Sequence, residues 1–266
     1  MSITSTQVDR ATIQFHEAAG SLKPHVGCFW VVTAECGGSI HIVPDGSTAI
    51  SIQLQGGEPA EWFLRGPLVR PETRRYASGG TVVGIRLRPG VAFLLSGISA
   101  DAMVGCHLRL RELEAFQELV ATQLSPRTPA ESIDALQRFL IGRLQDAKVH
   151  RTVAVAIREI ERARGVLQVS ELAARCDVSP RHLNRLMRSW VGYGPKRFAS
   201  IVRFQETLSR LEEAPGRSAA TLASETGFFD QAHLTIDVTR FAGATARTLA
   251  STSVADFSKT RCDDHP

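Results

Sequence analysis

The chain has 266 residues, of which 43% are hydrophobic, and it carries a formal net charge of +4 at pH 7. This length exceeds one ordinary domain and the apolar content suffices for two buried cores, so we expect two soluble domains. The sequence contains no run of about 18 apolar residues, and its polar start lacks an apolar signal segment. These features argue against a membrane span and predict a cytoplasmic protein.

The basic excess lies in one part of the chain. Residues 1–150 carry 14 Lys and Arg and 14 Asp and Glu, whereas residues 151–255 carry 15 basic and 10 acidic side chains. A local excess of positive charge is expected of a surface that binds phosphates. The second half of the chain is therefore the candidate for contact with nucleic acid.

Short β-type runs separated by Gly-rich and Pro-rich turns occupy the first part of the chain. The expected strands are residues 27–33, 39–43, 48–54, 61–64 and 81–87. Their close spacing predicts an antiparallel barrel or sandwich. The fragments FW at 29–30, VPDG at 43–46 and VGIRLRPG at 83–90 are similar to a cupin-like sensing domain. This similarity implies a jelly-roll-like barrel with a cavity.

Four side chains are candidates for the lining of such a cavity. Trp30 and Trp62 would form apolar walls, and Arg65 or Arg86 would hold an anionic group of a small-molecule effector. Aromatic residues on strands are also common in protein cores, and the sequence leaves this alternative open.

Metal chemistry is not expected in the barrel. A metal-binding cupin needs several histidines and a carboxylate on neighbouring strands. Here His41 is the only histidine on an expected strand, whereas His16 and His25 fall in expected loops. The five cysteines show no zinc-type spacing and are expected to be reduced thiols. We therefore expect no metal and no cofactor.

Apolar residues at helical spacing follow the barrel. Residues 108–124 and 133–144 show this pattern, with a turn or short linker at 125–129 between them. The apolar stripe of the second segment consists of Ile133, Leu136, Leu140 and Leu144. It would form half of a helix pair in a homodimer or pack against the barrel of its own chain, and both alternatives stay open.

Two stretches about fifty residues apart repeat one pattern. The pair LA at 172–173 is followed by HL at 182–183, and LA at 222–223 is followed by HL at 233–234. Each copy has room for a short helix, a tight turn and a second helix. The repeat therefore predicts two helix-turn-helix units.

The second helix of the first unit has two different faces. Ser179 and Pro180 predict its start, and Ser170 is expected to cap the short helix before it. At about 100° per residue, the inner face is apolar, with Leu183, Leu186, Met187 and Trp190. The outer face is a row of hydrogen-bond donors without an acid, with Arg181, Asn184, Arg185 and Arg188. A solvated surface without a partner is the alternative for this face.

Further motifs extend over residues 151–250. They include GPKRF at 194–198, GFFDQAHL at 227–234 and RFAG at 240–243. With the first unit, they make this region resemble the C-terminal DNA-binding domain of AraC/XylS-type transcription regulators. The resemblance implies seven helices, with a long helix from near Pro195 between the two units. Helical spacing independently predicts the inward stripe of the long helix as Phe198, Ile201, Val202, Leu208 and Leu211.

The resemblance implies that two recognition helices enter adjacent major grooves roughly 34 Å apart, so the DNA site should be two short boxes about ten base pairs apart. Base contacts are expected from Arg181, Asn184 and Arg185, since Arg suits guanine and Asn suits adenine. Phosphate contacts are expected from Arg188, Lys196 and Arg197. For Lys196 and Arg197, an ordinary place on the first turn of the long helix is the alternative.

The second unit departs from the family pattern. Relatives commonly have a basic residue two positions after the His-Leu pair and an aromatic residue two positions later, where this chain has Ile236 and Val238. The expected DNA-binding side chains of this unit are Gln231, His233 and Thr235. Sequence readout by the second unit should therefore be weaker than readout by the first unit. For His233, a packed or capping role is the alternative.

The sequence predicts an α+β protein with an N-terminal antiparallel β-barrel and a C-terminal all-α domain. The expected parts are a cupin-like sensing domain (1–105), a helical linker or dimerisation segment (106–150), a double helix-turn-helix DNA-binding domain (151–252) and a disordered tail (253–266).

The expected function is sequence-specific transcription regulation, with double-stranded DNA, RNA polymerase and a small-molecule effector as partners. Activation is implied by the family. The alternatives are a ligand-independent DNA-binding scaffold and an enzyme whose barrel is tethered to DNA. The sequence shows no catalytic constellation for the latter, so we expect no enzyme.

Overall fold

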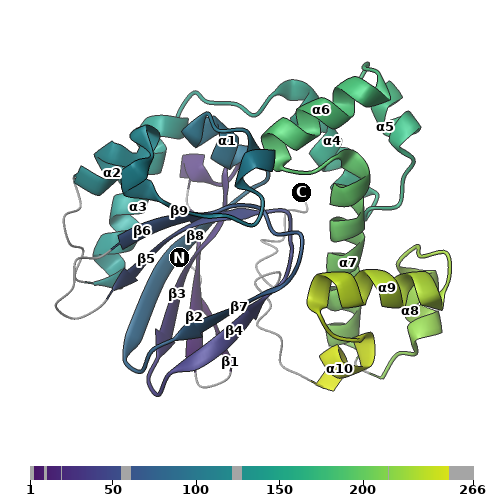
Figure 1. Ribbon diagram of the computed structural model, residues 1–266, viewed down its shortest axis with the longest axis horizontal. Helices are drawn as coiled ribbons and strands as arrows, with labels where there is room; N and C mark the ends of the chain where they lie inside the picture. The colour runs from purple at the N-terminus through teal and green to yellow at the C-terminus, as the bar shows by residue number, and fades with distance from the viewer. Residues whose placement is uncertain are drawn as a thin grey trace.

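The first half of the chain forms two antiparallel β-sheets (Figure 1). The computed structural model describes residues 3–8, 11–18, 20–54, 61–121, 128–214 and 216–251. Within these residues, seven strands pair in the order β1-β2-β3-β8-β5-β6-β9, and two further strands pair as β4-β7. The strands are β1 (Ile3–Val8), β2 (Ala11–Glu17), β3 (Val26–Ala34), β4 (Gly38–Ile42), β5 (Thr48–Leu54), β6 (Glu61–Arg65), β7 (Glu72–Tyr76), β8 (Gly80–Leu87) and β9 (His107–Arg109). The antiparallel β domain is as predicted, although the larger sheet is open rather than closed into a barrel.

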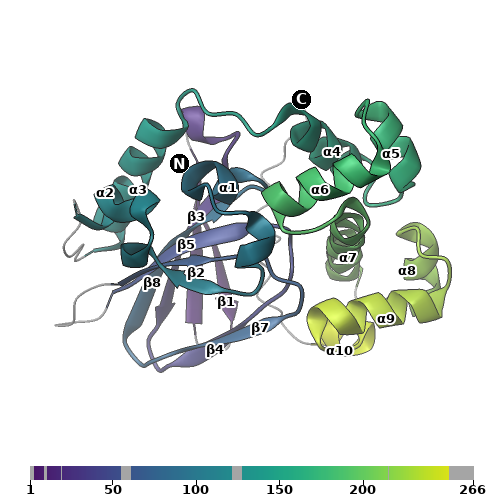
Figure 2. The same cartoon turned by 45° about the horizontal axis from the view of Figure 1, so that its top comes forward.

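Both faces of the larger sheet are covered (Figure 2). Along β3, Phe29 and Val31 belong to the apolar core under helices α1 (Val91–Ser96) and α3 (Pro129–Leu144). Trp30 and Val32 belong to a second core that includes residues of β4 and β7. Successive side chains of a strand point to opposite faces, so a strand covered on both sides reads as a continuous apolar run.

The described residues form four strands that the sequence patterns did not predict, and these are β1, β2, β7 and β9. Two of them, β1 and β9, are edge strands, and β7 lies in the small sheet. Such strands need fewer apolar positions, and β7 reads ETRRY. His16 lies on β2, so its expected place in a loop is wrong. His25 lies in the turn before β3, as predicted.

The segment after the larger sheet is less helical than predicted. In place of one helix over 108–124, the chain forms β9, two short 3-10 turns (Leu110–Glu112 and Glu114–Phe116) and the five-residue helix α2 (Gln117–Ala121). The β9 strand pairs with β6, and the following turns bury their apolar residues in the same core. Residues 122–127, which include most of the expected linker, lie outside the described residues.

Helix α3 packs against the sheet of its own chain. Thr128 and Glu131 form a reciprocal capping box at its start. Its predicted stripe shares one buried cluster with strands β3, β5 and β8, and consists of Ile133, Leu136, Leu140 and Leu144. Of the two alternatives for this stripe, the structure shows packing on the barrel domain.

Seven helices form the described part of the chain from residue 151 to residue 251, as predicted. They are α4 (Arg151–Arg162), α5 (Val169–Arg175), α6 (Pro180–Val191), α7 (Pro195–Glu213), α8 (Ala219–Glu225), α9 (Gln231–Ala242) and α10 (Ala246–Ser251). In Figure 1, α7 stands between a group formed by α4, α5 and α6 and a group formed by α8, α9 and α10. The predicted inward stripe of α7 is buried in the shared core. The expected tail, 253–266, lies outside the described residues.

The helical domain contacts the sheet domain along α6 and α7. The ring of Trp190 on α6 lies 4.4 Å, centroid to centroid, from Phe93 on α1. The hydroxyl of Tyr193 donates to the carbonyl of Leu68 over 2.7 Å, and Gln205 on α7 donates to the carbonyl of Pro44 over 2.7 Å. No helix among the described residues has the length and apolar character needed to cross a membrane.

Candidate nucleic-acid interface

Helix α6 begins where the sequence predicts. The hydroxyl of Ser179 accepts a hydrogen bond from the backbone N–H of His182 over 3.2 Å, and Pro180 occupies the first helical position. The preceding helix α5 begins earlier than expected, because the carbonyl of Gln168 already accepts from the N–H of Leu172. Ser170 therefore lies inside the first turn of α5 and is not its cap.

The two faces of α6 are those predicted. Leu183 and Met187 are buried in the helical core, and Leu186 and Trp190 are partly buried against it. Four polar side chains are exposed on the outer face, and they are Arg181, Asn184, Arg185 and Arg188.

The first half of this outer face carries two arginines without acidic partners. Arg185 Nη2 lies 3.1 Å from Nδ1 of His182, and neither Arg181 nor Arg185 has an ion pair within the described ranges. The amide oxygen of Asn184 lies so close to Gly194 that a Cβ atom there would come within 2.1 Å of it. A glycine at 194 therefore leaves room for the Asn184 side chain beside the turn into α7.

The second half of the outer face meets the sheet domain. Arg188 Nη2 lies 3.5 Å from a carboxylate oxygen of Asp101 in the short 3-10 turn Ala100–Met103. The hydroxyls of Ser99 and Ser189 are 3.3 Å apart. Between this turn and α6 lies an open depression of about 610 Å³, lined by the four polar residues of the α6 outer face.

The second unit starts with a charged cap. Asp230 accepts from the backbone N–H of His233 over 2.7 Å at the start of α9. Gln231 and Thr235 are exposed on α9, and the hydroxyl of Thr235 donates to the carbonyl of Gln231. The ring of His233 is partly buried and lies edge-on against Phe228, with centroids 5.3 Å apart. The geometry of His233 thus favours the packed alternative over a free DNA-binding side chain.

A buried ion pair ties α9 to α7. Arg203 Nη2 lies 3.6 Å from a carboxylate oxygen of Asp237, and both side chains are largely buried. The Arg203 guanidinium also lies 4.5 Å above the centre of the Phe228 ring. Arg240 turns toward the same carboxylate at 3.8 Å. The sequence patterns missed Asp237 because its partner lies on another helix.

Comparison with known proteins agrees with this arrangement. Residues 172–251 match a family described as a helix-turn-helix domain. The C-terminal region is an AraC-type helix-turn-helix domain. Domains of this type bind double-stranded DNA in transcription regulators. Residues 14–109 match a family described as a domain of unknown function. No protein with a curated description matches the sequence.

Two solved structures are similar to parts of the chain. The C-terminal domain of AraT, a response regulator from Geobacillus stearothermophilus, is 17% identical; the match covers 44% of this chain and 96% of that chain, with a TM-score of 0.38. ToxT from Vibrio cholerae is 8% identical; the match covers 81% of this chain and 97% of that chain, with a TM-score of 0.44.

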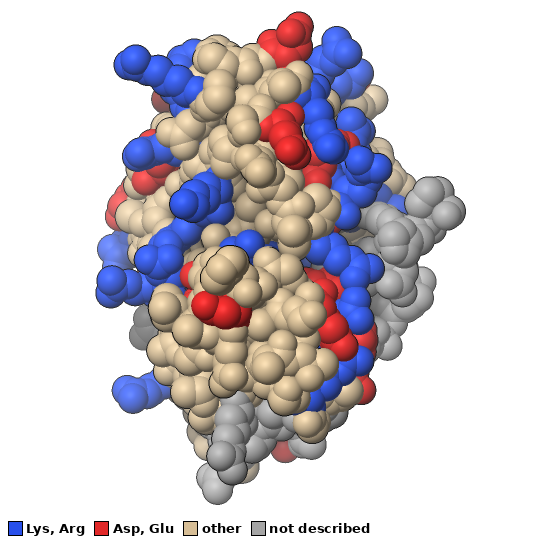
Figure 3. All heavy atoms as spheres, turned by 90° about the vertical axis from the view of Figure 1, so that its right-hand side faces the viewer, with Lys and Arg blue, Asp and Glu red and all other residues tan. Residues whose placement is uncertain are grey.

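The AraC-type domain presents many basic side chains on the side shown in Figure 3, with acidic side chains among them. At the start of α7, Lys196 is exposed, whereas Arg197 is partly buried with its guanidinium 5.3 Å above the centre of the Phe241 ring. Burial lowers the pKa of Arg197 from its usual value. Of these two expected phosphate contacts, Lys196 has the more accessible position.

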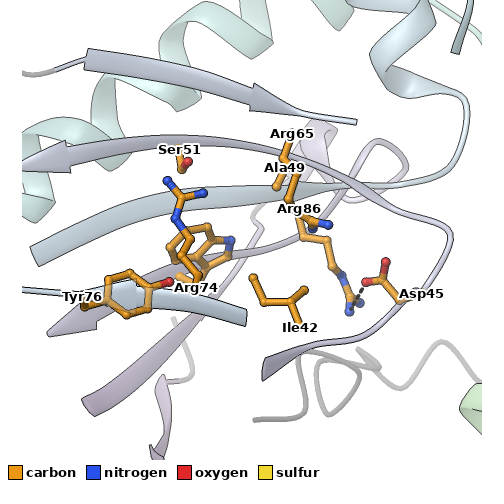
Figure 4. Close-up of a pocket in the computed structure, with 9 residues that line it drawn as sticks. Ile42, Asp45, Ala49, Ser51, Arg65, Arg74, Tyr76 and Arg86 are labelled. Carbon is orange, nitrogen blue, oxygen red and sulfur yellow. Dashed lines mark ion pairs between the residues drawn. The ribbon is translucent and has the colours of Figure 1, made fainter. Parts of the chain in front are cut away.

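The expected effector residues divide between the two faces of the larger sheet. Trp30, Arg65 and Arg86 line a pocket between the two sheets (Figure 4). Trp62 lies in the opposite core, under α1 and α3, so its expected place in this pocket is wrong. The two tryptophans lie on opposite faces of the larger sheet. Because both faces are apolar, the sequence pattern does not show which face each tryptophan points to.

Proposed function

We propose that the protein is a sequence-specific transcription regulator that reads DNA mainly through α6. The observation that carries this proposal is the outer face of α6, where Arg181, Asn184 and Arg185 are exposed on a capped helix. Its apolar face is anchored in the core. The match of residues 172–251 to a helix-turn-helix family supports the same proposal.

The residue types suggest the division of labour along α6. Arg181 and Arg185 have the planar donor groups that pair with guanine, and Asn184 has the amide that pairs with adenine. Arg188 lies further along the helix, where a contact to the phosphate backbone would add affinity without sequence preference. Lys196 is exposed at the start of α7 and would make the same kind of contact.

We propose a supporting role for α9 in the adjacent major groove. Gln231 and Thr235 are its exposed polar side chains near the start, and Arg240 is drawn toward Asp237. The two helices would contact boxes about ten base pairs apart, centre to centre. The box under α9 should be the less sharply defined one, since it meets no arginine near the start of the helix.

We further propose that the sheet domain senses a small-molecule effector. Its 3-10 turn at 100–103 contacts the outer face of α6, so a shift of this turn would change access to Arg188. Activation, contact with RNA polymerase and a homodimer are parts of the proposal that rest on the family resemblance alone.

Selection of bound fragments from random double-stranded DNA tests this function. The expected result is an enriched site with two boxes, of which one contains a guanine that loses its preference in Arg185→Ala. Arg138→Ala is the matched control, because Arg138 is exposed on α3, in the sheet domain. Recovery of sequences without any shared motif would contradict the proposal.

A further inference from the structure

The second helices of the two helix-turn-helix units can be compared position by position. Helices α6 and α9 both have 12 residues, and each starts at a capping side chain, Ser179 in α6 and Asp230 in α9. Each helix ends at a glycine in the left-handed conformation, Gly192 in α6 and Gly243 in α9. The two starts and the two ends are offset by the same number of residues. Each residue of α6 therefore has one counterpart in α9.

The polar outer face of α6 has an uncharged counterpart in α9. Its four residues correspond to four exposed residues of α9 that carry no charge and that each have a methyl group. In chain order, these four residues are Ala232, Thr235, Ile236 and Thr239. The position that Arg185 occupies in α6 is thus occupied by Ile236 in α9.

The side chain of Ile236 points away from the core. It is 63% exposed, and among the described residues only Phe229 is a more exposed large apolar side chain. The apolar residues that anchor α9 lie on its other side, where Leu234 and Val238 are fully buried. Ile236 therefore does not hold α9 in place, and it lies at the position that in α6 is proposed to read a base.

The polar groups near Ile236 are already engaged within the protein. The hydroxyl of Thr235 donates to the carbonyl of Gln231 over 2.8 Å. Arg240 lies 3.8 Å from a carboxylate oxygen of the buried Asp237. Apart from the amide of Gln231, the outer face over the first two turns of α9 therefore offers methyl groups rather than hydrogen-bond donors.

We propose that α9 reads thymine in its DNA box through apolar contacts, with Ile236 as the residue that determines this specificity. Of the four DNA bases, only thymine carries a methyl group at the edge exposed in the major groove, and apolar side chains contact this methyl group favourably. Against the other bases, isoleucine covers polar edge atoms without giving them a hydrogen bond, which is unfavourable. The inference rests on the proposed DNA-binding role of α9 and deepens it, because it names the base that the second box contains.

The thymine preference of α9 is smaller than the guanine preference of α6. Burial of one methyl-sized group changes an equilibrium constant about fourfold. A good paired contact of arginine with guanine changes it about 5- to 150-fold. The selected DNA site should therefore combine a sharply defined guanine under α6 with a less sharply defined thymine under α9.

Replacement of thymine by uracil in the selected site tests the proposal on the full chain. Uracil has the same pairing edge and the same major-groove oxygen as thymine, and it lacks only the methyl group. The box under α6 is the one whose guanine preference is lost in Arg185→Ala, and the other box lies under α9. Fluorescence anisotropy measures the Kd for each duplex. We expect the Kd to rise about fourfold for uracil at the contacted position and to stay unchanged for uracil outside both boxes.

Variants assign the methyl effect to one side chain. Ile236→Ser removes the apolar group from an exposed position, so thymine and uracil at the contacted position should bind equally well. Ile141→Ser is the matched control, since it removes another exposed isoleucine, on α3 of the sheet domain, and it should keep the fourfold difference. Ile236→Arg gives α9 the residue type of its α6 counterpart, so the preference should move from thymine to guanine. Circular dichroism spectra establish that the variants fold.

Three results would overturn the proposal. They are an α9 box without an enriched thymine, equal binding of thymine and uracil by the wild type, and a uracil effect that persists in Ile236→Ser. The uracil measurement on the wild type needs no variant, so it decides the matter even if a variant does not fold. An Ile236→Ser variant that binds all duplexes like the wild type but sediments differently would assign Ile236 to a contact between proteins and would also overturn the proposal.

The same measurements separate this inference from the proposed function. A selected site whose guanine depends on Arg185, with a second box that is indifferent to the methyl group, contradicts only the inference about Ile236. Failure to select any shared site contradicts sequence-specific regulation itself.

Discussion

The two helix-turn-helix units share one plan and differ in their charge. Helix α6 starts with a neutral Ser179 cap, and its outer face has Arg181 and Arg185 without an acidic partner in the described chain. Helix α9 starts with the carboxylate of Asp230, and Arg240 turns toward the buried Asp237. The same local fold thus places these unpaired arginines on one helix and a charged cap on the other, which is why we propose that α6 reads bases and that α9 makes a supporting contact.

The units also differ in what anchors them. The C-terminal end of α6 is held partly by the sheet domain, through Trp190 against Phe93 and the ion pair between Arg188 and Asp101. Helix α9 is anchored on α7 by the pair of Arg203 with Asp237. A signal from the sheet domain should therefore act first on α6, which is also the helix that we propose to read the sequence.

The largest expected effect concerns the anchor of α9. Asp237→Ala leaves the largely buried Arg203 guanidinium without its partner, so the free energy of unfolding should fall by about 3–5 kcal/mol. Urea denaturation measures the change. Glu171→Ala, at an exposed position on α5, is the control and should lie within about 0.5 kcal/mol of the wild type. Similar stability of the two variants would contradict a structural role for the pair.

The second effect concerns DNA affinity. Arg185→Ala should weaken binding to the selected site by about 1–3 kcal/mol and relax the preference at one base pair. The double variant Gln231→Ala, His233→Ala should lose less, because it removes no arginine and because the ring of His233 packs against Phe228. Fluorescence anisotropy with specific and random duplexes measures both losses. A larger loss in the double variant would reverse the ranking of α6 and α9.

The helix caps provide a matched pair of smaller effects. Ser179→Ala and Asp230→Ala should each reduce stability by about 0.5–2 kcal/mol, because each removes a side-chain acceptor from a helix N-terminus. Only Asp230→Ala also removes a negative charge, so it should strengthen DNA binding of the folded protein at low salt. Thermal denaturation and low-salt anisotropy measure the two effects. Weaker DNA binding by folded Asp230→Ala would argue against the proposed placement of α9 at the DNA.

The smallest expected effect concerns the contact between the sheet domain and α6. Asp101→Ala releases Arg188, and partly exposed ion pairs are worth about 0.2–1 kcal/mol, so DNA affinity should rise by about 1.4- to 5-fold. Asp134→Ala is the matched control, since it removes the same charge from an exposed position on α3. The gain should vanish in an Arg188→Ala background. A gain that persists there would mean that Asp101 acts by general repulsion of DNA.

Local signals explain why much of the helical domain was predictable. Ser179 and Pro180 define a helix start through contacts with their neighbours in sequence, and the apolar spacing that includes Leu183 and Met187 identifies the inner face. These signals do not depend on distant parts of the chain. The outer face of α6 and the inward apolar stripe of α7 could therefore be inferred without a structure, whereas the long helix itself was implied by the family resemblance.

Contacts between distant segments explain what was missed. The sequence does not place Asp101 beside Arg188, or Asp237 beside Arg203, since each pair joins separate elements. It also does not show that Trp62 faces away from the pocket, because both faces of the sheet are apolar. The sequence patterns did not identify Arg74 as a pocket residue, because its strand β7 is polar and lacks the apolar run expected of a buried strand.

Hydroxyl-radical footprinting of the selected DNA site most directly tests the claim that α6 dominates reading. The wild type should protect two patches about one helical turn apart. In Arg185→Ala, at equal protein concentration, protection should weaken over both patches, and the loss should be larger over the patch under α6. Protection that survives in Arg185→Ala but disappears in the Gln231→Ala, His233→Ala variant would contradict the account.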